Sequence, residues 1–240
     1  MLLSSLASSR GFSARAYAAR TYEAFMPPFA KHGGYCDGST RGFLRRAAAG
    51  ASVPHTGVAD DQANAFARLA PLVACLAGDP SLLRCVEQAV RVTQASDLAV
   101  ACGVQAARVL EAILLGAAPS EAVAAAIARC EASGSPHDAL SAALSAARLP
   151  HDEAVALLGR NCHLPGSLAS AVHALLVFPS YEDAVNATIA QGGCNASRAG
   201  FIGACWAAAQ GEAAIPNKWK ARFTAYSRTA ELADEMLLTN

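Results

Sequence analysis

Two short segments hold the residues whose types and spacing could do chemistry. One is the acidic pair Asp60-Asp61; the other opens with Gly192-Gly193 and continues through Asn195, Ser197 and Arg198. Glycines that precede a helix can cradle phosphate oxygens with backbone N–H groups, so the second segment is a candidate contact for a pyrophosphate ligand. It also fits a structural role, in which the glycines end one helix in left-handed backbone and Arg198 is solvated or ion-paired.

The acidic pair and the neighbouring Cys194 also have competing interpretations. Cys194 stands where a helix begins, a position that favours a thiolate. A nucleophile also needs a base, and the sequence places neither His163 nor His173 beside it, so we expect an inert small residue. Asp60-Asp61 can cap a helix predicted over residues 63–77, because acids suit a helix N-terminus. A vestigial or single-metal site is the alternative for these two acids.

The elements that would position these residues are helices. Alanine, the strongest helix former, dominates the chain, and aromatic residues make up only 6% of it. Helix-start signals such as Asp79-Pro80, Pro119-Ser120 and the Ser180/Asp183 capping box recur, whereas no alternating strand pattern of useful length does. The helices are predicted over residues 13–29, 63–77, 79–93, 97–116, 119–131, 135–148, 151–161, 166–177, 180–191 and 195–209, with a final pair over 216–238. The sequence therefore predicts a compact all-α fold.

Composition excludes several classes of protein. A chain of 240 residues is expected to form one domain with one sizeable core. Its net charge of zero argues against a broad basic face for nucleic acid, and no apolar run is long enough to suggest a membrane span. Its eight cysteines include no C-x-x-C pair, which favours small buried hydrophobes in a reducing compartment over zinc ligands.

The first residues have the composition of an organelle-targeting segment. Arginine and serine are frequent there, and no acidic residue precedes Glu23. We predict residues 1–12 to be a targeting segment or N-terminal extension and residues 13–240 to be the domain. A mitochondrial address is favoured, with plastid or cytoplasm as alternatives. Because Ser13–Phe29 reads as a helix of the domain, any presequence is expected to be short or retained.

A series of blocks resembles the ADP-ribosylglycohydrolase family, in particular its branch of J-type crystallins and selenoprotein-J-like proteins. The blocks are Gly33–Gly42 (GGYCDGSTRG), Ala59–Ala65 (ADDQANA), Val92–Gln94 (VTQ), Leu164–Ser167 (LPGS) and Ser180–Trp219, which ends in Ile-Pro-x-x-Trp. Their order along the chain is more specific than any one of them. The resemblance implies an all-α domain of that family, but the block that opens the family domain has no counterpart here. It therefore implies a domain that lacks its first helical layer and needs another surface to cover the exposed neighbours.

The resemblance also implies where a metal centre would stand. Family enzymes hydrolyse ADP-ribosyl glycosidic bonds with two magnesium ions, held by a Thr-Asp-Asp turn and an Asp-x-Asp-Thr turn. The first turn here is Ala59-Asp60-Asp61, which has lost the hydroxyl ligand. The second is Cys194-Asn195-Ala196-Ser197, which has no carboxylate. Losing two negative charges should weaken the binding of a divalent pair by several kcal/mol.

Two functions from different classes follow. The first is a non-catalytic ADP-ribosylglycohydrolase-like protein that serves as an accessory or structural subunit of a mitochondrial assembly, such as a respiratory-chain or ribosomal complex. It needs protein subunits as partners, no cofactor and no nucleic acid. The alternative is a magnesium-dependent ADP-ribosyl hydrolase with a rebuilt site of Asp60, Asp61, Asn195 and Ser197 and an ADP-ribose-like ligand. A structural protein of crystallin type is a third, less specific interpretation.

Overall fold

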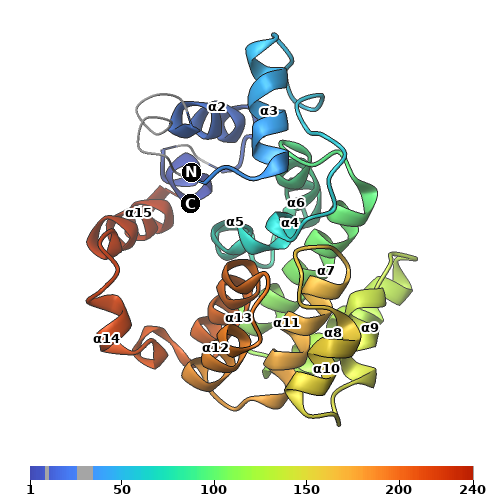
Figure 1. The fold of residues 1–240 in the computed structure, drawn as a ribbon. Coiled ribbons are helices and arrows are strands. Elements are labelled where there is room, and N and C mark those ends of the chain that lie inside the picture. The colour runs from blue at the N-terminus through green and yellow to red at the C-terminus, as the bar shows by residue number, and fades with distance from the viewer. Residues whose placement is uncertain (9–10, 26–34, 240) are drawn as a thin grey trace.

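The computed structural model describes residues 1–8, 11–25 and 35–239. Within these residues the regular secondary structure consists of helices joined by loops, with no strand (Figure 1). Two isolated bridges, Val58 with Gln94 and Gln62 with His163, are the only extended pairings in the described residues. The helices are α1 (Leu2–Ala7), α2 (Ala14–Phe25), α3 (Gly38–Ala48), α4 (Asn64–Ala67), α5 (Ala70–Leu76), α6 (Leu82–Arg91), α7 (Asp97–Leu114), α8 (Pro119–Ala132), α9 (Asp138–Ser145), α10 (His151–Leu158), α11 (Gly166–Val177), α12 (Tyr181–Ala190), α13 (Asn195–Gln210), the 3-10 helix η2 (Glu212–Ala214), α14 (Asn217–Lys220) and α15 (Tyr226–Thr239). The predicted all-α class is confirmed.

The core is built around α7, α11 and α13. Residues 167–175 of α11 are all buried, because α8, α9, α10, α12 and α13 surround this helix. α7 packs against α6, α8 and α13, and small residues let the helices approach closely. A Cβ atom at Gly103 of α7 would lie 3.0 Å from a methyl carbon of Val90, so the α6–α7 contact depends on its absence.

Most helices begin near the residues at which the capping signals of the sequence predicted a helix start. The Ser96 hydroxyl accepts from the backbone N–H of Ala99 at 3.3 Å and begins α7. Ser180 caps α12 in the same way through Asp183, and Pro119 opens α8. These predictions are confirmed because a cap is a contact among residues close in sequence.

The helix expected over 63–77 is instead two helices, α4 and α5. Pro71 stands in the first turn of α5 and cannot donate to a preceding carbonyl, so a new helix begins there. The expectation that Asp60 or Asp61 caps this segment is wrong, since α4 begins at Asn64 and no side chain caps it at Ala63. The helices expected over 135–148 and 151–161 are also shorter: α9 begins only at Asp138, and α10 stops before Gly159, whose φ is +115°.

The described part of residues 1–12 belongs to the packed domain. Leu2 and Leu6 of α1 are 4% and 1% exposed, and α1 packs against α2, α5 and α15. The two chain ends consequently lie together (Figure 1). The part of the chain predicted to be an address thus contributes side chains to the core.

The cysteines and the helices bear on two further sequence predictions. All eight cysteines are free; Cys85, Cys102, Cys130 and Cys205 are buried and the other four are half-buried. Burial raises the pKa of the Cys102 thiol to about 12, with a smaller contribution from Asp138. Among the described helices, none combines the length and the apolar character that crossing a bilayer requires.

If α1 is part of the cooperative fold, Leu6→Ala should lower the free energy of unfolding by about 2–5 kcal/mol, the usual cost of emptying a buried leucine site. Urea denaturation monitored by circular dichroism measures the change. Leu157→Ala is the matched control, because Leu157 is 73% exposed, and it should stay within about 0.5 kcal/mol of wild type. Equal stability of the Leu6→Ala variant and wild type would show that α1 is a dispensable attachment.

Candidate functional site

Three loops from distant parts of the sequence meet at the position that the resemblance assigned to a metal centre. The Ala63 N–H donates to the Cys162 carbonyl and the Leu164 N–H to the Asp61 carbonyl, each at 2.8 Å. The Cys194 N–H donates to the Arg160 carbonyl at 2.9 Å. Loop 160–164 therefore joins the Asp60-Asp61 turn to the start of α13. The two turns named by the resemblance are brought to one junction.

Asp60 is already engaged by neutral donors. Its Oδ1 accepts from the Gln62 backbone N–H and from Gln94 Nε2, both at 2.9 Å. Gln94 is fully buried and donates to the Gln62 carbonyl as well, while its Oε1 accepts from Arg68 at 3.1 Å. Asp60 thus closes a turn and anchors a buried glutamine. Gln94 lay within a resembling block, but the sequence did not link it to the acid.

Asp37 is a third acid at this junction, and sequence reasoning missed its role. It caps α3 by accepting from the Thr40 N–H at 2.9 Å and the Thr40 hydroxyl at 2.8 Å. The Ser39 hydroxyl and Asn64 Nδ2 donate to the same carboxylate at 2.7 and 2.9 Å. Burial alone would raise the pKa of Asp37, but these hydrogen bonds and the charge of Arg68 outweigh it and lower the pKa. The preceding Gly33 and Gly34 of this block lie outside the described residues.

Asp61 faces outward and pairs with His163. The Asp61 Oδ1 lies 2.8 Å from His163 Nδ1, and the two side chains are 47% and 57% exposed. An exposed pair of this kind contributes little to stability. Its members come from loops that are adjacent only because of the Gln62–His163 bridge, so no sequence pattern could have paired them.

The glycine segment has the left-handed backbone that its structural interpretation predicts. Gly192 and Gly193 both have φ of +69°, which is left-handed backbone. A Cβ atom at Gly193 would lie 1.9 Å from the Arg160 carbonyl oxygen, whereas one at Gly192 would touch nothing. Gly193 is therefore required for the approach of loop 160–164 to α13.

Two of the polar residues after the glycines, Asn195 and Arg198, turn toward protein backbone. The expectation of a solvated or ion-paired Arg198 is wrong: its side chain is 1% exposed, and its Nη2 donates to the Gly192 carbonyl. Burial lowers the pKa of Arg198. The Asn195 amide also turns inward and, in the orientation that satisfies it, donates to the Thr188 carbonyl at 3.2 Å. Ser197 lies half-buried in the first turn of α13.

The two histidines considered as partners for Cys194 are otherwise engaged. His163 binds Asp61, as described above. His173 is fully buried, with its Nε2 donating to the Ala146 carbonyl at 3.1 Å and its Nδ1 3.0 Å from Nδ1 of His151. Burial lowers the pKa of His151 to about 4, so the stacked pair is neutral near pH 7. This arrangement gives His173 a packing role in the core.

The donor set does not fit a pair of magnesium ions. Magnesium needs oxygen ligands in near-octahedral array, and each close ion needs carboxylates to offset its charge. Here Asp60 is occupied by amide donors, Asp61 by a histidine, and the start of α13 offers a thiol and an inward amide. Within the described residues, no three His, Cys, Asp or Glu side chains are grouped so that they could hold a metal ion. No catalytic step through a metal can be derived from this arrangement.

Replacing Asp37 by Asn tests the network at the start of α3. The variant should lose about 1–3 kcal/mol of stability at pH 7, because an amide cannot accept from all four donors. The folded-state pKa lies below the model-compound value of 3.8, so the stabilisation is present above that pH and is lost as pH falls through the folded-state pKa. Urea unfolding at pH 7 and near pH 2 should show the difference between the two proteins shrinking in acid. A difference that is independent of pH would contradict this role.

The glycine pair supplies an internal comparison. Gly192→Ala and Gly193→Ala both force alanine into left-handed backbone, at a cost of about 1–2 kcal/mol. Gly193→Ala should cost clearly more, because its Cβ meets a backbone oxygen that cannot swing aside. Thermal denaturation of both variants checks the order. Equal losses in the two would show that loop 160–164 is not held against α13.

Comparisons with known proteins identify the family and the fold of this chain. The family model for ADP-ribosylglycohydrolase matches residues 1–240. Crystallin J1A of Tripedalia cystophora is 29% identical over 247 aligned residues, covering 98% of this chain and 76% of that protein. Crystallin J1B of the same animal is 32% identical over 85 residues, covering 35% of this chain and 26% of its own length. A solved structure titled "ADP-ribosylglycohydrolase-related protein complex" superposes with a TM-score of 0.80 at 24% identity, over 99% of this chain and 78% of that one, and so shows the shared fold. The chain belongs to the ADP-ribosylglycohydrolase family.

Proposed function

We propose that this protein is a non-catalytic member of its family, used as an accessory or structural subunit of a protein assembly in mitochondria. The observation that carries the proposal is the junction of the three loops. There two of the acids, Asp37 and Asp60, accept hydrogen bonds from neutral protein groups, and the turn at the start of α13 holds Cys194 and Ala196 in place of acids. The hydrogen bonds of the junction hold the three loops together and so stabilise the fold.

The charge at this position supports the loss of catalysis. Two divalent ions bring four positive charges to a small volume, and only nearby carboxylates offset them. At about 4 Å, each added carboxylate is worth between about 1 and 4 kcal/mol per unit of opposing charge, depending on solvent access. Of Asp60 and Asp61, only Asp61 faces outward, and it already contacts His163. It therefore supplies only a small part of the negative charge that two divalent ions need.

Two further observations support the cellular part of the proposal. The similar protein of Tripedalia cystophora is named a crystallin, which supports a use of this fold outside turnover. The N-terminal residues carry arginine and serine without acid before Glu23, as matrix-directed segments do. Because α1 is packed into the core, we propose that this segment is retained after import.

Calorimetric titration with MgCl₂, and with ADP-ribose in the presence of magnesium, tests the catalytic half of the proposal. The wild-type protein should give no saturable heat with either titrant. The double substitution Cys194→Asp with Ala196→Asp should gain magnesium binding, because it returns two carboxylates to the facing turn. Saturable binding by wild type that is lost in Asp60→Ala and Asp61→Ala, with release of ADP-ribose from a modified substrate, would establish the alternative hydrolase function.

A separate experiment tests the proposed assembly in mitochondria. In cells that express the native gene, the protein should sediment with mitochondrial matrix markers in a particle larger than its own 24.6 kDa. A monomer in the cytosol would contradict this part and leave the catalytic conclusion unchanged.

A further inference from the structure

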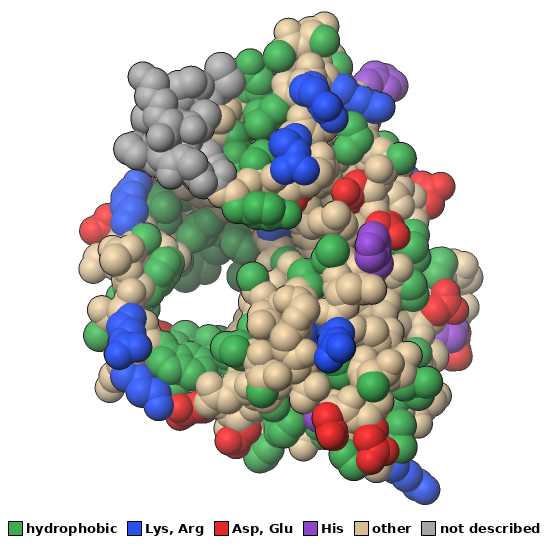
Figure 2. Space-filling model, in the orientation of Figure 1, with side chains coloured by type: hydrophobic (Ala, Val, Ile, Leu, Met, Phe, Trp, Pro, Cys, Tyr) green, Lys and Arg blue, Asp and Glu red, His purple; other side chains and the backbone are tan. Residues whose placement is uncertain are grey.

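The C-terminal segment forms an arc that stands away from the rest of the molecule. After α13 the chain passes through η2 and α14 to α15, and α15 packs back against α1 and α5 (Figure 1). The space-filling view shows an opening beside this arc, bordered by apolar side chains (Figure 2). A cavity of about 620 Å³ lies on the arc's inner side, between the start of α12 and the elements η2, α14 and α15. We call this cavity with its lining the window.

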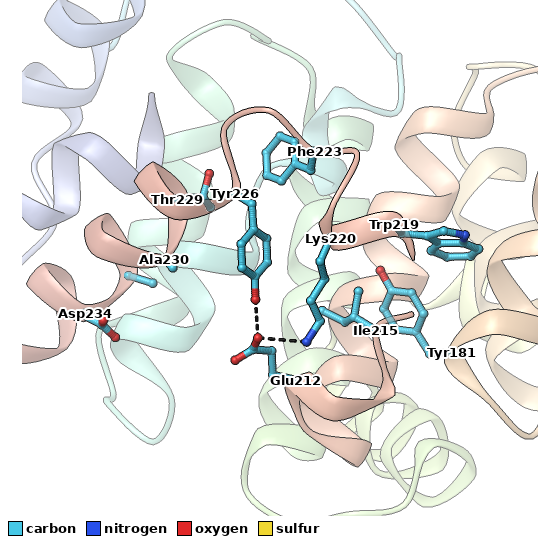
Figure 3. A pocket seen from close by; sticks show the side chains of 11 residues that line it. Tyr181, Glu212, Ile215, Trp219, Lys220, Phe223, Tyr226, Thr229, Ala230 and Asp234 are labelled. Atoms are coloured by element: carbon cyan, nitrogen blue, oxygen red, sulfur yellow. Dashed lines mark hydrogen bonds and ion pairs between the residues drawn. The ribbon is translucent and has the colours of Figure 1, made fainter. Parts of the chain in front are cut away.

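One face of α15 is turned toward the window, and among the described helices it is α1 and α5 that pack most closely on α15. Tyr226, Ala230 and Ala233 follow one another at helical spacing and line the cavity. Figure 3 shows Tyr226 and Ala230 on this face of α15. Met236, three residues after Ala233, is 4% exposed and belongs to the core. The side of α15 next to this stripe is therefore packed into the domain, while the stripe itself lines the cavity. Small residues at such positions let a second helix approach closely, as in a helix-in-groove contact.

The other walls of the window are aromatic. Trp219 and Tyr181 lie with their ring centroids 5.9 Å apart, and Phe223 is 51% exposed at the edge. Tyr181 and Trp219 are half-buried against the core, so their accessible edges and the exposed Phe223 give the window aromatic surface of the kind that protein interfaces favour.

The size of the window indicates what fits it. An α-helix with its side chains is about 10–12 Å across and rises 5.4 Å per turn, so one turn occupies on the order of 400–600 Å³. The cavity of about 620 Å³ therefore has the volume of about one turn of helix.

The charged residues of the window indicate which charge its occupant should carry. Glu212 and Lys220 neutralise each other at 3.0 Å, and the Tyr226 hydroxyl also donates to Glu212 (Figure 3). Asp234 lines the same cavity, and no ion pair to it is found within the described residues. The window therefore carries one uncompensated negative charge beside an apolar stripe.

We propose that the window is the docking site for an amphipathic α-helix of another protein, with an apolar face for Tyr226, Ala230 and Ala233 and a Lys or Arg opposite Asp234. This inference rests on the proposed function, because it names the surface by which a non-catalytic subunit would join its assembly. It concerns α15, which is remote in sequence from the junction of Asp60 and Cys194.

A fluorescence titration tests the proposal with two designed peptides. One is a Leu/Lys amphipathic helix of about 15 residues, long enough to form a helix alone, and the other has Glu in place of every Lys. Trp219 lies in the window and Trp206 is 7% exposed, so binding should shift the emission to shorter wavelength through Trp219. The Leu/Lys helix should bind saturably, and Trp219→Phe should remove the shift.

Three variants make the result specific. Ala233→Trp fills the window and should abolish binding. Asp234→Lys should weaken the Leu/Lys helix by about threefold to tenfold and strengthen the Leu/Glu helix. Glu153→Lys is the matched control, because Glu153 is an exposed acid on α10, and it should behave as wild type.

Each other outcome overturns the proposal. Binding of both peptides with equal strength, or binding unchanged by Ala233→Trp, would show a non-specific apolar surface. Self-association of wild type in analytical ultracentrifugation that Ala233→Trp removes would assign the window to a second copy of this chain. If neither peptide binds and the magnesium and ADP-ribose titrations give no saturable heat, the proposed docking site is wrong and the proposal of a non-catalytic protein stands.

Discussion

The close approach of Gly193 to the carbonyl of Arg160 is the contact on which the junction depends. It leaves no room for a Cβ atom and places the Cys194 N–H on that carbonyl. Once loop 160–164 lies there, its other side pairs with residues 61–63 through the Gln62–His163 bridge. The start of α13, and with it the inward course of Arg198, is set by the same contact. One backbone position thus determines how three distant segments meet.

The acids at this junction are used as hydrogen-bond acceptors between loops. In a metal centre, acidic oxygens point at cations, and their mutual repulsion destabilises the protein without metal. Here the oxygens of Asp37 and Asp60 point at amides and hydroxyls, so they stabilise the folded chain directly.

Much of the helix pattern could be predicted from the sequence, because caps and prolines act over a few residues. Ser96, Pro119 and Ser180 each begin the helix that they indicated. Contacts between distant segments could not be derived in this way. Burial of Arg198, the pairing of Asp61 with His163 and the buried hydrogen bonds of Gln94 follow from tertiary packing, and short-range patterns carry no information about it.

The resemblance located the junction correctly but did not give its hydrogen bonds. It implied that the Asp60-Asp61 turn and the Cys194 turn belong to one site, and in the structure both contact loop 160–164. The resemblance did not predict the role of this loop. The window at α15 lay beyond both kinds of reasoning. The stripe of Tyr226, Ala230 and Ala233 looks like an ordinary core face in sequence, and only the fold shows that it faces open space.

The most direct test of the central claim is a crystal structure of the protein soaked in manganese chloride, with anomalous scattering recorded at the manganese edge. Manganese accepts the oxygen ligands that magnesium uses and reports its own position. Our account predicts no ordered anomalous peak among Asp60, Asp61 and Cys194. Two ordered manganese ions at that junction, each coordinated by these side chains, would contradict it.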